Sequence, residues 1–229
     1  MDSTDPRYKL RLIANGFGTT LFAPDSAQGA LRRVKLGWGA EYLVVGHAAR
    51  LYPAKDHAGF LAAARLLAGR LPAACFLFIG QGMAPDNPAL AACLEPPLLG
   101  HCALMVCSDD VPAWFTAMDV FAQSSLSEGL LNALGETLPS GLPVAATDAG
   151  DTRAWVGPAG RVGLPGHPYV LAEALEQLWR LRQRWRARAW AARSSAGNRA
   201  TPWRPWQGIF EAIPGNGCSM PAARRIRVV

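Results

Sequence analysis

Two glutamates eight positions apart, Glu128 and Glu136, lie between short apolar segments at 119–123 and 143–147. The intervening length suits a helix that follows a strand, which puts Glu128 at the junction and Glu136 inside the helix. Backbone N–H groups in the first turn of such a helix can bind an anion such as a diphosphate, and the carboxylates can accept hydrogen bonds from sugar hydroxyls. The spacing therefore predicts a sugar-nucleotide site, although a capped helix with a solvated glutamate would explain it equally well.

Two cations, Arg50 and Lys55, follow the apolar segment 42–47 on either side of a turn at Pro53. The guanidinium offers a planar fork for a phosphate, and the ammonium acts as a point charge. A leaving nucleoside diphosphate gains negative charge as a glycosidic bond breaks, so cations at the edge of a sheet stabilise the transition state more than the ground state. Either residue alone would be interpreted as a solvated loop cation, but the pair after a buried strand favours function.

Strands alternate with helices along most of the chain, which predicts an α/β fold, a Rossmann-like mostly parallel sheet with helices on both faces. Apolar runs predict strands at 42–47, 75–79, 102–107, 119–123, 143–147 and 161–164. Helical periodicity predicts helices at 56–70, 89–95, 111–118, 131–138 and 151–156, and a longer one from Pro168. Asp56 is expected to cap the first of these helices, and the segment 103–106 is expected to be buried.

Composition narrows the class of protein. Half of the 229 residues are hydrophobic, and no G-x-G-x-x-G, P-loop or G-x-S-x-G motif occurs, so dinucleotide, P-loop and serine-hydrolase interpretations lose support. Five cysteines without CxxC spacing indicate a reducing compartment. His101, Cys102 and Cys107 have no second ligand pair, so no metal site is expected. With no apolar run of about 18 residues and no basic leader, a cytoplasmic protein is expected.

The remaining motifs occur in the order and spacing of one family. They lie at 15–16, 45–56, 76–80, 109–112, 127–136 and 141–148. From about residue 10 to about residue 178 the chain resembles the C-terminal half of group 1 glycosyltransferases, family four of the GT-B type. The resemblance implies that this half binds the nucleotide sugar, that an N-terminal half supplies most of the acceptor site, that transfer retains the anomeric configuration, and that no metal cofactor is needed.

At matching positions the resemblance also implies residue roles. Arg50 and Lys55 would hold the diphosphate, Glu128 the donor sugar hydroxyls and Glu136 the ribose; Arg50, Lys55 and Glu128 are thus the candidate catalytic residues. The other candidate donor-binding residues are Gly16, Gly129, Leu130, Leu131 and Asn132. Gly16 would let the backbone approach the phosphates, with a plain turn as the equal alternative. The base, uracil or guanine, and the sugar stay open.

Several positions depart from the family pattern. Gly18 stands where an aspartate is usual, Leu130 and Leu131 replace an aromatic residue and a proline, Val106 replaces a glycine, and Pro139 falls in the last turn of the Glu136 helix. Because no N-terminal domain precedes residue 10, we expect a truncated protein that binds nucleotide and transfers sugar poorly unless a separately encoded half completes it. The alternative is a catalytically inactive nucleotide-binding remnant or interaction module.

The C-terminal segment carries the positive charge. Residues 1–179 hold 12 Lys and Arg against 16 Asp and Glu, whereas 180–229 hold 11 against 1. The expected organisation is a lead at 1–9, a nucleotide-sugar-binding domain at 10–165, a basic helical segment at 166–212 and a disordered basic tail at 213–229. Tryptophans and arginines at 179–193 could contact an anionic membrane at the inner face; packing of the tryptophans on the sheet domain or on the missing half is favoured, and nucleic acid is least favoured.

Overall fold

The computed structural model describes residues 21–84, 86–91, 100–106, 110–129 and 131–181, with residues 17, 94, 98 and 184. The strands of this part form one parallel sheet in the order β3-β2-β1-β4-β5-β6. They are β1 (Leu43–Ala48), β2 (Ala74–Ile79), β3 (Cys102–Met105), β4 (Val120–Gln123), β5 (Val144–Thr147) and β6 (Gly160–Gly163). This order is that of a doubly wound Rossmann-like sheet and agrees with the predicted fold class.

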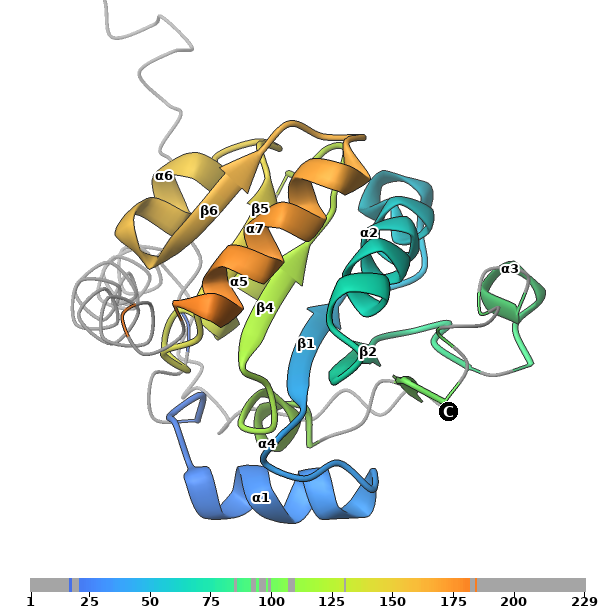
Figure 1. Cartoon of the computed structure of the whole chain (residues 1–229). Helices are drawn as coiled ribbons and strands as arrows, with labels where there is room; N and C mark the ends of the chain where they lie inside the picture. Colours follow the sequence, from blue (N-terminus) through green and yellow to red (C-terminus); the bar gives the residue numbers. More distant parts are fainter. Residues whose placement is uncertain are drawn as a thin grey trace, which may run out of the picture. The chain divides into compact units, whose positions relative to one another are not determined.

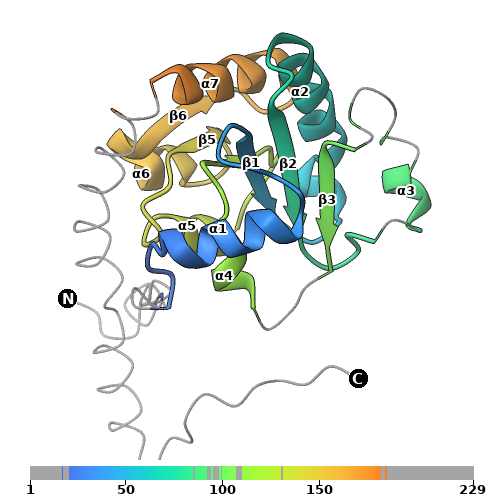
Figure 2. The same ribbon diagram turned by 60° about the horizontal axis from the view of Figure 1, so that its bottom comes forward.

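Helices cover both faces of the sheet (Figures 1 and 2). They are α1 (Ser26–Lys35), α2 (His57–Arg70), α3 (Pro88–Ala91), α4 (Val111–Phe115), α5 (Asn132–Thr137), α6 (Thr152–Val156) and α7 (Pro168–Arg180), with 3-10 turns η2 (Pro53–Lys55) and η3 (Gly157–Ala159). Helices α2 and α7 bury their apolar side chains against one face of the sheet, and α4, α5 and α6 pack on the other. Figure 2 shows the two layers on opposite sides of the strands.

The central strands are buried almost throughout and mostly hydrophobic because both of their faces are covered, with one polar residue near the carboxyl end of each of β1, β4 and β5. Phe60, Phe76 and Phe78 are buried on the α2–α7 side, and Phe115 and Phe121 on the other. Burying a side chain of this size contributes about 1.5–3 kcal/mol relative to leaving it exposed. The two packed layers therefore hold the sheet rigid, and with it the loops at the carboxyl ends of the strands.

The edge strand β3 differs from its prediction. The segment 103–106 was expected to be buried, but all of β3 is only half-buried, and Val106 is 56% exposed. The strand ends at Met105, one residue before Val106. Among described strands β3 pairs only with β2, so it lacks the second neighbour that buries the central strands. An apolar run alone does not distinguish an edge strand from a central one.

Helix α1 is an element that the sequence did not predict. Asp25 caps it by accepting a hydrogen bond from Gln28 N at 2.9 Å. Only Gly29 is buried in it, against the backbone of Thr116, while Leu31 is 61% exposed. The helix is held through Arg33, whose Nη2 lies 2.7 Å from the carboxylate of Asp119. A helix attached by a glycine and by the ion pairs of Arg32 with Asp110 and of Arg33 with Asp119 carries no apolar stripe to reveal it.

The other predicted elements agree with the structure to within a few residues at their ends. Asp56 caps α2, accepting from Gly59 N at 3.0 Å, as expected. Helix α4 ends at Phe115 rather than near 118, α3 ends at Ala91, and Pro139 follows α5 instead of lying inside it. Gly18, the lead at 1–9 and the tail at 213–229 lie outside the described residues.

The predicted basic segment at 179–193 is described only at its start. Trp179 is partly buried and packs against the α2–α7 core, which agrees with the packing interpretation for this tryptophan. Arg180 donates to Glu176 at 2.5 Å. Trp185 and Trp190 lie outside the described residues. Within the described residues, the helices are too short or too polar to span a bilayer.

Candidate functional site

The site lies at the carboxyl ends of the adjacent parallel strands β1 and β4. Between these two strands the order in which the chain adds strands to the sheet reverses. The chain leaves β1 toward α2 on one face and leaves β4 toward α5 on the other. Diverging connections of this kind open a crevice in parallel α/β sheets. A cavity of about 620 Å³ occupies this place, a size that ordinary small-molecule ligands fill.

Most of the predicted donor-binding residues meet at this cavity. Six of the nine line it: Arg50, Lys55, Glu128, Gly129, Leu131 and Asn132. Glu136 is described but is not among the lining residues. Gly16 and Leu130 lie outside the described residues. The motifs after β1 and after β4 therefore converge on one place although more than 70 positions separate Lys55 from Glu128.

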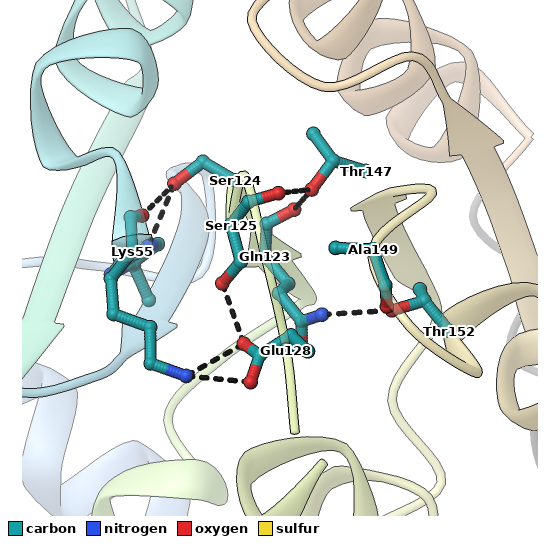
Figure 3. A network of polar contacts seen from close by, with 9 residues as sticks. Lys55, Gln123, Ser124, Ser125, Glu128, Thr147, Ala149 and Thr152 are labelled. Carbon is teal, nitrogen blue, oxygen red and sulfur yellow. Dashed lines mark hydrogen bonds and ion pairs between the residues drawn. The ribbon is translucent and has the colours of Figure 1, made fainter. Parts of the chain in front are cut away.

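An ion pair between Lys55 and Glu128 occupies the centre of the site (Figure 3). Lys55 Nζ donates to both carboxylate oxygens, at 2.7 and 2.6 Å. The Glu128 side chain is only 5% exposed and that of Lys55 is 23% exposed. Ser125 Oγ donates a third hydrogen bond to Glu128, at 2.6 Å. The resemblance assigns Lys55 and Glu128 to different parts of a ligand, and in the structure these two residues bind each other.

A hydroxyl at the end of β4 fixes the turn that carries Lys55. Ser124 Oγ lies 2.8 Å from the carbonyl oxygen of Lys55 and 3.0 Å from that of Asp56, and it donates its proton to these acceptors. His47 Nε2 lies 3.1 Å from the same oxygen, so it donates the proton that Ser124 accepts. Leu126 N adds a backbone bond to Ala54 O at 2.8 Å. The η2 turn and the end of β4 are therefore joined by backbone and side-chain bonds.

A second set of hydroxyls supports the end of β4 from the other side, as Figure 3 shows. Thr147 Oγ1 on β5 donates to Ser125 O at 2.5 Å. Gln123 Nε2 donates to Thr152 Oγ1 at 3.1 Å, and that hydroxyl donates to Ala149 O at 2.6 Å. These buried polar groups are satisfied within the protein, and a satisfied network fixes the geometry of its members. The position of Glu128 is thus set by β4 and β5 together.

The Arg50 guanidinium packs over the ring of Tyr52, a residue that the sequence analysis did not single out. Its guanidinium carbon lies 4.9 Å from the ring centroid of Tyr52, and both residues line the cavity. The Tyr52 side chain is 52% exposed. A cation over an aromatic face is attracted by the ring quadrupole. Tyr52 therefore restricts the otherwise mobile Arg50 side chain at the rim of the cavity.

We expect Tyr52→Ala to weaken binding of a nucleoside diphosphate about two- to fivefold, since an exposed cation–π contact contributes about 0.5–1 kcal/mol. Tyr52→Phe keeps the ring and should retain the affinity of the unmodified chain. Calorimetric titration measures both variants. Equal loss in the phenylalanine variant would show that the hydroxyl, and not the ring beneath Arg50, is responsible.

Glu136 lies in the second turn of α5, half-buried, and burial raises the pKa of its carboxyl. Next to it, Gly135 packs against the ring of Phe17: a Cβ at Gly135 would lie 2.0 Å from Phe17 Cζ. Phe17 also meets the Trp155 ring edge to face at 5.8 Å. The residue that directly follows Gly16 in the chain is therefore anchored beside Glu136. The role of Glu136 toward a ribose stays a prediction.

Two buried histidines lie beneath the Arg50–Lys55 turn. His47 is 2% and His57 5% exposed, with ring centroids 4.8 Å apart, and His47 stacks on Phe60 at 4.6 Å. Burial, and then the charge of His57, lower the pKa of His47 well below its ordinary value. Burial lowers the pKa of His57 to about 4. Both rings are neutral at pH 7, which agrees with the hydrogen bond that His47 donates to Ser124.

These histidines predict an acid-labile fold. In the unfolded chain each protonates near pH 6.5, whereas folded His57 resists protonation until about pH 4. The contribution of these histidines to the free energy of unfolding is thus fully present above pH 6.5. As the pH drops from 6.5 toward 4, the free energy of unfolding decreases by about 1.4 kcal/mol per pH unit for His57 alone. Urea unfolding at pH 7, 6 and 5 measures the slope. His57→Leu should reduce the slope by about 1.4 kcal/mol per pH unit, the contribution of one proton. A free energy of unfolding that does not change between pH 6.5 and 5 would contradict the expectation.

Comparison with known proteins identifies related chains. The family model for group 1 glycosyl transferases matches residues 42–180. EpsF of Bacillus subtilis, named as a glycosyltransferase, is 30% identical over 143 residues, which is 62% of this chain. The UDP-Gal:alpha-D-GlcNAc-diphosphoundecaprenol alpha-1,3-galactosyltransferase of Escherichia coli is 29% identical over 137 residues, 59% of this chain. The similarity covers the sheet and the cavity described above.

A solved structure shares the fold. HepE of Anabaena in complex with UDP-glucose superimposes with a TM-score of 0.78 and 25% sequence identity, over 88% of this chain and 56% of that one. The predicted Rossmann-like fold class is thereby confirmed. The chain spans 37% of EpsF and 35% of the galactosyltransferase, little over a third of each. This partial coverage fits one half of a two-domain enzyme.

Proposed function

The chain belongs to the group 1 glycosyl transferases, and we propose that its cavity is the donor site of a hexosyltransferase that binds a UDP-sugar. The observation that carries the proposal is the meeting of Lys55 and Glu128 in one cavity at the switch point of the sheet. A cation suited to a diphosphate lies beside a carboxylate suited to hydroxyls. A UDP-glucose complex of a protein with the same fold agrees with this ligand class.

In the proposed reaction the bond between the anomeric carbon and the β-phosphate oxygen breaks, and the nucleoside diphosphate leaves with the electron pair. Lys55 and Arg50 stabilise the charge that develops on the diphosphate, because their ammonium and guanidinium line the same cavity. Glu128 orients the sugar by accepting from its hydroxyls. The acceptor oxygen bonds to the anomeric carbon with retention, and its proton passes to the oxygen of the leaving diphosphate. We propose that these cations make a metal unnecessary.

The acceptor site is proposed to lie largely on a second half, on the same polypeptide or on another chain, because related enzymes are much longer than this sequence. By its name the Escherichia coli relative acts on a diphosphoundecaprenol-linked sugar. A similar lipid-linked acceptor would suit contact of residues 179–193 with an anionic membrane, which the sequence favours less than packing of their tryptophans. Assaying transfer with a chain that carries a second half tests the first statement, and vesicle co-sedimentation with and without anionic lipid tests the second.

Calorimetric titration of the chain with UDP, GDP, UDP-glucose and GDP-glucose tests the donor site. We expect UDP and its sugar to bind, and expect Arg50→Ala to weaken both because one of the two cations is lost. Glu136→Ala, measured beside it, tests the ribose contact: it should weaken uridine as well as UDP, whereas Arg50→Ala should not affect uridine. Absence of binding by every nucleotide would contradict the proposal.

A further inference from the structure

We infer that Glu128 is an internal competitor for Lys55, which makes the site prefer an intact nucleotide sugar to the free nucleoside diphosphate. The inference rests on the proposed function and adds a specificity role to one of its residues. In the structure Lys55, the proposed diphosphate cation, is already neutralised by Glu128, the carboxylate that would hold the sugar. Binding of a ligand must therefore begin by dividing this ion pair.

The geometry shows how complete the neutralisation is. Both oxygens of Glu128 lie within 2.7 Å of Lys55 Nζ, and the carboxylate is almost fully buried. Ser125 holds one of these oxygens at 2.6 Å, so the carboxylate cannot readily turn away when the ammonium leaves. The Ser125 carbonyl is in turn fixed by Thr147. Lys55 is the more exposed and longer partner, so it is the one that can move.

A free nucleoside diphosphate meets an unfavourable site. To reach the ammonium it must share Lys55 with Glu128 or displace it, and either arrangement leaves two anions in one cavity. At an effective dielectric constant of about 20, unit charges about 6 Å apart repel by a few kcal/mol, only part of which Lys55 and solvent offset. A displaced Glu128 keeps the bond from Ser125 but loses two charge-assisted bonds. Glu128 thus opposes binding of the product.

An intact nucleotide sugar meets a different situation, because its hydroxyls arrive with its phosphates. Hydroxyl groups donate to Glu128 and replace the ammonium, so Lys55 turns to the diphosphate without leaving a buried carboxylate unsatisfied. Each residue of the ion pair then has a partner in the ligand, the sugar for Glu128 and the diphosphate for Lys55. After transfer the sugar has left the donor, so Glu128 binds Lys55 again. This weakens binding of the diphosphate and favours its release.

The test is Glu128→Gln, titrated with UDP, UDP-glucose, GDP and GDP-glucose. Glutamine keeps the shape and can still accept from Lys55 and Ser125, so the variant is expected to fold, and thermal unfolding checks this. We expect the variant to bind the nucleoside diphosphate about tenfold more tightly than the unmodified chain. The intact nucleotide sugar loses charge-assisted bonds to Glu128, so its advantage over the diphosphate should shrink by at least that factor.

Two controls separate charge at this site from other effects. Glu176→Gln neutralises a glutamate on α7 that is ion-paired with Arg70 and Arg180, outside the cavity, and should leave both affinities unchanged. Glu128→Asp keeps the charge and shortens the side chain, so the diphosphate should bind this variant less tightly than it binds Glu128→Gln. If aspartate tightened binding as much as glutamine, size and not charge would be responsible.

The outcomes distinguish the inference from the proposed function. If the unmodified chain binds diphosphate and nucleotide sugar but Glu128→Gln binds the diphosphate equally or less tightly, the inference is overturned and the donor site stands. If the unmodified chain binds none of the four ligands, the proposed function fails and the inference fails with it. Tighter diphosphate binding in Glu128→Gln than in Glu128→Asp, with Glu176→Gln unchanged, supports the competitor role.

Discussion

Exchanging Lys55 for methionine is expected to weaken binding of UDP and UDP-glucose about 100-fold. The Lys55 ammonium is half-buried whereas Arg50 is exposed, and a charge-assisted contact to a phosphate contributes about 1.5–3 kcal/mol. Methionine preserves much of the stem but carries no charge, and Glu128 then faces the ligand as an unneutralised anion. The two effects act in the same direction, which is why this loss should exceed that of Arg50→Ala. Calorimetric titration measures it.

The same variant should lose stability, since Glu128 would remain almost fully buried without its cation. Removing one partner of a buried pair costs about 3–5 kcal/mol. The double variant Lys55→Met/Glu128→Gln should recover most of this stability. It should also recover the part of the UDP affinity that the unneutralised carboxylate cost, but not the part that the ammonium contributes. Urea unfolding of both variants shows the difference. Wild-type affinity in Lys55→Met, or no recovery of stability in the double variant, would contradict this account of the site.

A loss of about 3–5 kcal/mol in the free energy of unfolding is also expected for Asp119→Ala, far from any ligand. The Asp119 carboxylate lies 2.7 Å from Arg33 Nη2 and accepts from Val44 N at 3.0 Å. Its side chain is 6% exposed and that of Arg33 is 14% exposed. Without this carboxylate, Val44 N loses its acceptor, and the Arg33 guanidinium loses its anionic partner and keeps the carbonyl oxygens of Ala117 and Tyr42. Urea unfolding is the measurement.

The matched control is Asp148→Ala, which removes the carboxylate from an ion pair of the same length, 2.7 Å, with Arg153. That pair is exposed, with 65% of the Arg153 side chain in solvent, so its loss should cost less than about 1 kcal/mol. Similar losses in the two variants would show that burial of the Arg33–Asp119 pair does not set its contribution.

The sheet could be predicted from sequence because its strands are continuous apolar runs separated by helical segments, and each run was placed within one or two residues. Helix α1 could not be predicted, since Gly29 and Arg33 attach it and Leu31 faces solvent. The exposure of β3 also escaped prediction, because which strand lies at an edge depends on pairing order and not on the strand itself.

The sequence motifs predicted which residues lie in the site but not the hydrogen bonds and ion pair between them. Arg50, Lys55 and Glu128 all line the cavity, yet their separate assignment to diphosphate and sugar concealed the ion pair between Lys55 and Glu128. Ser124 and Ser125 were missed, although hydroxyls at the carboxyl end of a buried strand are a signal that could have found them. His47, a single polar side chain within an apolar strand, was another such signal.

The bonds that join the η2 turn to the end of β4 have a consequence for recombining such enzymes. Ser124 bonds to Lys55 O, Leu126 N to Ala54 O, and the Lys55–Glu128 pair closes the same contact. Segments 53–56 and 124–128 therefore form one unit in space despite their distance in the gene. A chimaera that takes them from two parents with different residues there inherits two half-sites, whereas exchanging both segments together transfers a working one.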